Sequence, residues 1–268
     1  MELERARRVA VEAAEAAGAL LRAGTRGPLG VRAKGGSGDV VTDLDLAAEK
    51  LILERLTGAF PEHAVIAEES GLLGESASAE WTWLVDPLDG TNNVAIGLPA
   101  YVVGLALCRR GRPVLGVVHD PVTARTWSAL RGRGAYCSTG VRLSPPARPW
   151  PHGPLLAWTQ GHAVARDDPV VRALKGTLEV AARRVLQLWA PLLSWVMLAR
   201  GDIDGFIGYR AEAVDLPAGA LIAQEAGLEV RALDGGPFEE HIDGGPEDRS
   251  FVAGHPDVIG ALLELSRA

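Results

Sequence analysis

Cysteine is nearly absent from this sequence: only Cys108 and Cys137 occur among 268 residues. Two thiols are too few for a disulfide framework or for a cysteine-based zinc site, and we therefore expect a reducing, cytoplasmic setting. Long apolar runs are also missing, since no stretch reaches the roughly 18 residues of a membrane-spanning helix. The acidic segment 1–5 is not followed by the apolar core of a signal peptide. We therefore expect neither secretion nor a membrane partner.

Basic residues are in the minority. Lys and Arg together number 27 against 34 Asp and Glu, which gives a formal net charge of −7. A protein that binds nucleic acid without sequence preference needs a basic face, so we expect no nucleic-acid partner. Local cations or metal ions can still attract a small phosphorylated metabolite against the overall sign. Lysine is especially rare, with only Lys34, Lys50 and Lys175.

The composition, 47% hydrophobic and 23% charged, is that of a globular chain with a substantial core. Apolar residues recur at helical spacing or in strand-like runs along most of the chain. We expect helices at 2–23, 43–56, 168–175, 190–200, 216–226 and 256–266, and strands at 64–67, 81–85, 101–108, 114–119, 126–130, 135–137, 203–207 and 228–231. Loops are expected at 24–38, 70–80 and 235–248. This order predicts a layered α/β (α+β) protein whose first half contains an antiparallel meander.

The proline-rich segment 144–154 marks the expected boundary within the chain. We expect an N-terminal α+β half (1–143) and a C-terminal α/β half (144–268) that together form one compact unit. No internal repeat is found.

Four carboxylates follow two of the expected strands. Glu68 and Glu69 come directly after one strand, and Asp86 and Asp89 come after the next. If the two strands are neighbours, these acids converge at one edge of the sheet, where α/β proteins bind ligands. Like charges at such distances need compensation. Oxygen ligands without histidine or cysteine suit a hard cation such as Mg²⁺.

The segment between Asp86 and Thr91 combines several useful features. Pro87 restricts the backbone, Gly90 permits a tight turn, and Thr91 is placed to cap a short helix whose amides suit a phosphate. Metal ligands beside an anion cradle are what phosphoryl transfer to water requires. An acidic surface turn is the alternative explanation of this segment.

Five parts of the chain, in order, resemble the motifs of the inositol monophosphatase family of magnesium-dependent, lithium-sensitive phosphatases. The most specific part is Asp86-Pro87-Leu88-Asp89-Gly90-Thr91-Asn92-Asn93, which looks like the family signature. Further resemblance lies in 39–45 (preceded by Lys34), 67–70, 116–121 with 132–136, and 214–220. It spans roughly residues 5–265, which is almost the whole chain.

The resemblance implies a layered αβαβα sandwich of the inositol monophosphatase and sugar phosphatase type. It also implies a hydrolase that cleaves a small phosphomonoester, of the inositol, cyclitol or sugar phosphate kind, with metal-activated water. Two or three Mg²⁺ ions per site would be its cofactors, with Mn²⁺ as a substitute. Homodimers are common in the family, so a homodimer is expected here.

The family's metal ligands carry over by position. Glu68, Asp86 and the backbone carbonyl of Leu88 match the ligands of the first magnesium. Asp86, Asp89 and Asp215 match those of the second, and the resemblance implies a third, weaker ion near Glu68. Asp215 opens an expected helix, so a plain helix cap is the alternative for it.

The family's catalytic and substrate-binding residues carry over in the same way. Thr91 and Asp45 match the pair that orients and deprotonates the attacking water, with Glu69 assisting. Gly90 and Thr91 match the phosphate-contacting turn, while Asp89 and Lys34 complete the substrate side. An in-line attack without a phospho-enzyme is implied. Asp45 as a helix cap, and Lys34 and Glu69 as solvated charges, are the alternatives.

The substrate side departs from the family pattern. The stretch 188–195 has Trp, Pro and Leu where the family has Gly, Ser and Ala. Trp189 is thus expected to offer a stacking surface for a sugar ring, nucleobase or imidazole, or else to pack in the core together with Trp195. The glutamate that contacts inositol hydroxyls has no clear match: an ungapped count reaches Gly208, and a shifted loop reaches Glu212. We also expect His119, His162 and His255 to be structural or surface residues.

Three alternatives to the main hypothesis remain. The same chemistry can act on a nucleotide or histidinol phosphate. A haloacid-dehalogenase-like enzyme would use an aspartyl nucleophile, although its Asp-x-Asp-x-Thr pattern is not found at 86–91. A non-catalytic family member would keep the metal site and act by binding, but an idle cluster of acids is costly to keep folded.

Overall fold

The computed structural model describes residues 3–34, 38–73 and 79–266. Its helices are α1 (Leu3–Gly24), α2 (Asp43–Ala59), α3 (Thr91–Ala95), α4 (Pro169–Ala181), α5 (Pro191–Arg200), α6 (Pro217–Glu225) and α7 (Ile259–Leu265), with a 3₁₀ turn at Glu247–Arg249. The strands are β1 (Val31–Lys34), β2 (Asp39–Thr42), β3 (Ala64–Ala67), β4 (Gly71–Leu73), β5 (Trp81–Asp89), β6 (Val102–Arg109), β7 (Arg112–Asp120), β8 (Arg125–Leu130), β9 (Ala135–Cys137), β10 (Leu155–Gln160), β11 (Arg184–Leu186), β12 (Gly205–Tyr209), β13 (Glu229–Ala232) and β14 (Phe251–Gly254).

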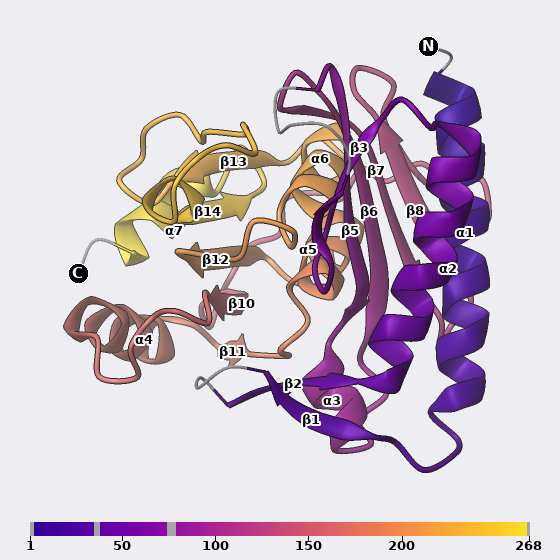
Figure 1. The fold of residues 1–268 in the computed structure, drawn as a ribbon. Helices are drawn as coiled ribbons and strands as arrows, with labels where there is room; N and C mark the ends of the chain where they lie inside the picture. Colours follow the sequence, from indigo (N-terminus) through magenta and orange to yellow (C-terminus); the bar gives the residue numbers. More distant parts are fainter. Residues whose placement is uncertain (1–2, 35–37, 74–78, 267–268) are drawn as a thin grey trace.

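Five layers build the molecule (Figure 1). A seven-stranded sheet in the order β4-β3-β5-β6-β7-β8-β9 is covered on one face by α1 and α2. Its other face packs on α5 and α6. The same two helices pack against a second sheet, β11-β10-β12-β14-β13, whose outer face carries α4 and α7. The expected αβαβα sandwich is therefore confirmed.

The helix α1 shows how the outer layer fits the sheet. Its buried side chains are mostly alanines, and this small-residue stripe lets the helix lie close to α2 and to the central strands. A Cβ at Gly116 on β7 would lie 2.5 Å from the carbonyl oxygen of Ala218 on α6, so glycine is required for that close approach. Small residues thus allow helices to pack close to both faces of the first sheet.

The helix α2 begins where the sequence predicts. Thr42 is its N-cap, accepting a hydrogen bond from the Leu44 amide. Asp45 completes the capping box by accepting the Thr42 amide hydrogen at 2.8 Å. A capping box satisfies two otherwise unpaired amides, so the start of α2 and the position of Asp45 are set by local sequence.

Several expectations about loops were wrong. Val31–Lys34 forms β1, which pairs antiparallel with β2, so the predicted 24–38 loop contains a strand. Gly71–Leu73 forms β4 at the edge of the first sheet. The strands β2, β10, β11 and β14 were not predicted either. Gly35 and Gly36, and residues 74–78 of the predicted 70–80 loop, lie outside the described residues.

No helix within the described ranges combines the length and the apolar character that crossing a membrane requires. The division of the chain at residue 143 stays a prediction. Both sheets share α5 and α6 as one packing layer, so residues from each half meet in that layer.

Candidate active site

Parallel pairing brings the first acids together. The strand β3 runs parallel to β5, with Ala67 opposite Val85, and the Glu68 amide donates to the Val85 carbonyl at 3.0 Å. Glu68 and Asp86 therefore lie side by side, as the sequence predicts, although Asp86 and Asp89 lie within β5 and not after it. β5 continues through Asp89, with a shift in its register against β6 between Asp86 and Asp89. This irregularity redirects the end of the strand at the point where its acids lie.

Asp215 reaches the same place from the loop before α6. Burial, and then the neighbouring carboxylates of Glu68, Asp89 and Asp215, raise the pKa of Asp86 well above its usual range. Burial and Asp215 do the same to the pKa of Asp89. The pKa of Asp215 is raised to about 7 by burial and by Glu68. The four carboxylates form one repelling cluster, which a cation would relieve.

Asp89 also ties the cluster to the second half of the chain. Its Oδ2 accepts the backbone N–H of Leu192 at 2.7 Å and that of Leu193 at 3.3 Å. These amides belong to the first turn of α5, where the helix dipole favours negative charge. The two bonds lower the pKa of Asp89 against the larger effect of burial.

A cation of the chain already touches this cluster. Lys34 Nζ lies 2.8 Å from Glu68 Oε1 and 2.6 Å from Glu69 Oε1. Burial opposes the charge on Lys34, but the two glutamates outweigh it and raise its pKa. Glu69 is mostly buried, so the alternative of a solvated charge is wrong for it, and its amide donates to Glu49 Oε2 at 2.8 Å.

The acids fit a hard divalent cation in donor type and in their need for compensating charge. Within the described residues, however, no three acidic, histidine or cysteine side chains are arranged to hold a metal ion as they stand. Lys34 contacts Glu68 Oε1, an oxygen that a cation could use, so a cation bound there would compete with Lys34.

Thr91 and Asp45 lie beside the acids. Thr91 Oγ1 is 2.7 Å from Asp45 Oδ1 and 2.9 Å from the Leu88 carbonyl oxygen. Asp45 is fully buried, and burial raises its pKa although hydrogen bonds from Thr42 and Thr91 oppose the shift. Asp45 is thus both a cap of α2 and the hydrogen-bond partner of Thr91, while its catalytic role stays a prediction.

Gly90 makes the turn into α3. Its φ of +107° lies in the left-handed region, and a Cβ there would lie 2.7 Å from the Ala100 carbonyl oxygen. Glycine is required on both counts. Gly90, and not Thr91 as predicted, is the N-cap of α3, because Thr91 is already the first helical residue.

A cleft of about 790 Å³ opens over these residues. This volume falls within the usual range for small-molecule sites. The predicted site residues that line it are Glu68, Asp86, Leu88, Asp89, Gly90, Thr91, Trp189 and Asp215. Lys34, Asp45, Glu69 and Glu212 do not line it. Instead, Glu212 Oε1 accepts the backbone N–H of His162 at 2.8 Å, which shapes the turn after β10.

Trp189 and His162 are the informative cases on the cleft wall. Trp189 is 53% exposed, so the alternative of core packing is wrong for it, whereas Trp195 is fully buried against Phe206 and Phe251. His162, expected to be structural or on the surface, lines the cleft with its Nδ1 3.0 Å from Asp39 Oδ2. This pair raises the pKa of His162 to about 9. No local sequence signal marks His162, because its partner lies on β2.

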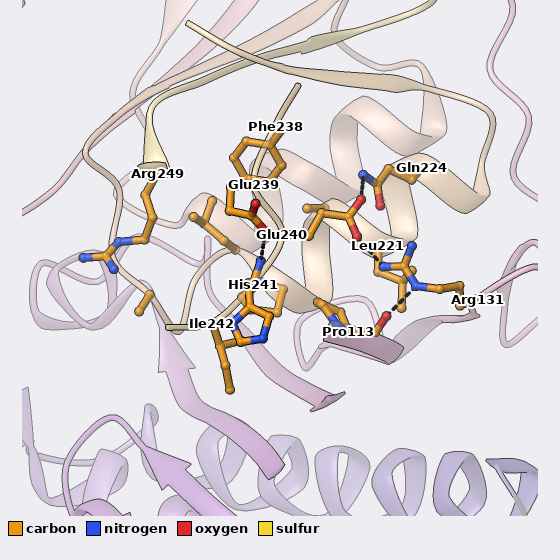
Figure 2. Close-up of a pocket in the computed structure, with 14 residues that line it drawn as sticks. Pro113, Arg131, Leu221, Gln224, Phe238, Glu239, Glu240, His241, Ile242 and Arg249 are labelled. Atoms are coloured by element: carbon orange, nitrogen blue, oxygen red, sulfur yellow. Dashed lines mark hydrogen bonds and ion pairs between the residues drawn. The ribbon is translucent and has the colours of Figure 1, made fainter. Parts of the chain in front are cut away.

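A second, much smaller cavity lies under the segment 238–242 (Figure 2). Glu240 accepts hydrogen bonds there from Arg131, at 2.7 Å, and from Gln224 on α6, also at 2.7 Å. Its volume is about 30 Å³, close to that of one water molecule. A metabolite does not fit, so the 790 Å³ cleft is the candidate site.

Comparison with known proteins gives consistent results. The model of the inositol monophosphatase family matches residues 2–264. The Nus factor SuhB of Escherichia coli K12 is 33% identical over 97% of this chain and 94% of its own length. The chloroplastic phosphatase IMPL1 of Arabidopsis thaliana is 34% identical over 85% of this chain and 61% of its own. The solved inositol monophosphatase of Anabaena superposes with a TM-score of 0.84 and 28% identity, covering 99% of this chain and 96% of that one.

Proposed function

This chain belongs to the inositol monophosphatase family, a family of metal-dependent phosphatases, and we propose that it hydrolyses a small phosphomonoester with the help of Mg²⁺. The observation that carries the proposal is the convergence of Glu68, Asp86, Asp89 and Asp215 at one end of the cleft. Family membership contradicts the haloacid-dehalogenase-like alternative, because that class belongs to another fold and uses an aspartyl nucleophile.

The residues proposed to hold magnesium are Glu68, Asp86, Asp89, Asp215 and the carbonyl of Leu88. Bound there, magnesium would polarise the phosphate and make water more acidic. Lys34 is proposed to move from Glu68 toward the substrate phosphate and to remain paired with Glu69, which holds it at 2.6 Å.

Thr91 and Asp45 are proposed to handle the proton of the attacking water. The Thr91 hydroxyl donates toward Asp45, which leaves its oxygen free to accept a hydrogen bond from water and to orient it. Because Asp45 is buried and its pKa is raised, it is more basic than a surface carboxylate and can take up a proton. Water would then attack phosphorus in line while the ester P–O bond breaks, the departing alcohol oxygen would take up a proton, and no phospho-enzyme is expected.

The substrate is proposed to be an inositol, cyclitol or sugar phosphate. Trp189 lines the cleft with an exposed ring, and such a face can stack on a sugar ring or on a base. Nucleotide and histidinol phosphates therefore stay in the test panel. Mn²⁺ as a substitute ion, a homodimer and a cytoplasmic location stay predictions.

Phosphate release decides the proposal. Purified protein is assayed with inositol, sugar, nucleoside and histidinol monophosphates, in magnesium and in chelator. We expect magnesium-dependent turnover of at least one of them. Asp89→Asn keeps an oxygen for the Leu192 amide but removes a charge, and we expect it to lower turnover by on the order of a hundredfold or more. The matched control is Asp167→Asn, at an exposed position.

The name of the Escherichia coli relative favours a second candidate. That protein is called a Nus factor, not a phosphatase. A family member that keeps the site but acts by binding would show no turnover of the panel while magnesium binding stays measurable by calorimetry. That outcome would refute hydrolysis of these substrates.

A further inference from the structure

The α4 side of the cleft has a cation of its own. The helix α4 borders the cleft there with Val171, Arg172, Lys175, Gly176 and Glu179. Lys175 Nζ is 3.0 Å from Gln187 Oε1 and 3.4 Å from Gln160 Oε1, and it lies over the Trp158 ring at 5.7 Å. All of these partners are neutral.

Lys175 thus differs from the other two lysines. Lys34 is held by Glu68 and Glu69, and Lys50 is exposed. Lys175 is partly buried, and no carboxylate of the described residues forms an ion pair with it. Burial lowers the pKa of Lys175, and Glu179, one turn away, offsets this only in part.

Among the described residues, the ammonium of Lys175 contacts only amide and aromatic groups, so it can still bind an anion. A charged acceptor would form stronger hydrogen bonds with it than the two amides do. Arg172 lines the same wall one turn earlier and adds a second positive charge. The acids Glu68, Asp86, Asp89 and Asp215 line the cleft on the side of the first sheet and α6, whereas α4 contributes Arg172, Lys175 and Glu179, a net positive charge.

A short stretch of chain connects the two sides. Gln187 contacts Lys175, the Leu188 carbonyl accepts a hydrogen bond from Asn93 on α3, and Trp189 faces the cleft. Three consecutive residues thus connect Lys175, the exposed ring of Trp189 and the helix α3. Two residue steps span at most about 7 Å, so the backbone of Trp189 lies within the length of about one sugar ring from that of Gln187, which contacts Lys175.

We propose that Lys175 binds a second anionic group, so that the preferred substrate is a phosphomonoester carrying a phosphate or carboxylate on the far side of its ring. The proposal rests on the proposed function, because the reactive phosphate is placed at the acids that are proposed to bind magnesium. Lys175 would act on binding alone, because an anion on the far side of the ring takes no part in the reaction and is held equally in substrate and transition state, which changes KM and not kcat.

The test uses three ligands that differ only at carbon 6 of one ring: glucose 1-phosphate, glucuronic acid 1-phosphate and glucose 1,6-bisphosphate. We expect the full-length protein to bind the two ligands with a second anion roughly ten- to a hundredfold more tightly than glucose 1-phosphate. Lys175→Gln should remove that preference and leave glucose 1-phosphate unaffected. Lys175→Arg should keep most of it, and Lys50→Gln, the matched control, should keep all of it.

Two readouts separate the claims. Phosphate release in magnesium tests hydrolysis, and calorimetric Kd values for the same three ligands test the subsite whether or not they are turned over. An unchanged preference in Lys175→Gln, or an equal loss for all three ligands, would overturn the proposal. A preference for only one of the two anionic ligands identifies the second group as phosphate or as carboxylate.

Discussion

Replacing Asp215 by asparagine should stabilise the protein when no divalent cation is present. Asp215 is half-buried, and loss of hydration together with the nearby Glu68 raises its pKa from 3.8 to about 7. Between these two pH values the folded state holds a proton that the unfolded state has lost. The free energy of unfolding therefore falls as pH rises through this window. Above pH 7 the wild type carries the whole destabilisation caused by the ionised Asp215.

The size of the effect follows from the shift. About three pKa units correspond to roughly 4 kcal/mol, and relaxation around the cluster reduces this to an expected gain of about 2–4 kcal/mol for Asp215→Asn at pH 8. For a chain of this length, 1 kcal/mol changes the melting temperature by about 2–3 °C. The variant should thus melt about 5–10 °C higher than the wild type in chelator at pH 8.

Thermal melts at pH 4, 6 and 8, in chelator and in magnesium, measure this. At pH 4 the difference in melting temperature between the variant and the wild type should nearly vanish, because Asp215 is then protonated in the folded wild type. In magnesium the wild type should melt at a higher temperature than the variant, since the ion stabilises the wild type by mass action and binds the variant weakly. Asp167→Asn, at an exposed position, is the control. A variant that is less stable in chelator at pH 8 would refute the repulsion argument.

Three further predictions concern the same site. Gly90→Ala should destabilise the protein by about 1–3 kcal/mol in urea unfolding, because its Cβ would lie 2.7 Å from the Ala100 carbonyl oxygen at a φ of +107°; a neutral result would contradict the required turn. The pair of His162 with Asp39 raises the pKa of His162 to about 9, so its stabilisation is complete below about pH 6.5 and is lost as pH rises through 9; as His162 is half exposed, His162→Gln should cost about 0.5–1 kcal/mol at pH 6 and nothing at pH 10. Phosphate release should fall on the acid side as the ligand carboxylates protonate and release magnesium, and a flat rate from pH 7 to 4 would exclude this.

Local pattern predicts the part of the site that neighbouring strands build. Glu68 directly follows β3 and Asp86 lies within β5, and the parallel pairing of the two strands places them side by side. Asp45 is a similar case, because its capping box is a local motif that also sets the side chain beside Thr91. Asp215 is different: only the resemblance points to it, since its position depends on the docking of α6 on the first sheet.

The missed features depend on contacts that are distant in sequence. The strands β1 and β11 have four and three residues and exist only through pairing with β2 and β10. Asp39 raises the pKa of His162, and Glu212 holds the turn at His162 by accepting its backbone N–H. Trp189 and Trp195 look alike in the sequence, but only Trp195 meets Phe206 and Phe251.

The backbone at Trp189 has one more consequence. Its φ of +52° is a conformation that glycine adopts freely and that costs other residues about 1 kcal/mol or more. If Trp189 stacks on the substrate ring, as proposed, backbone strain and substrate selection meet in one residue. Trp189→Gly is then expected to relieve the strain and to remove the stacking surface at the same time.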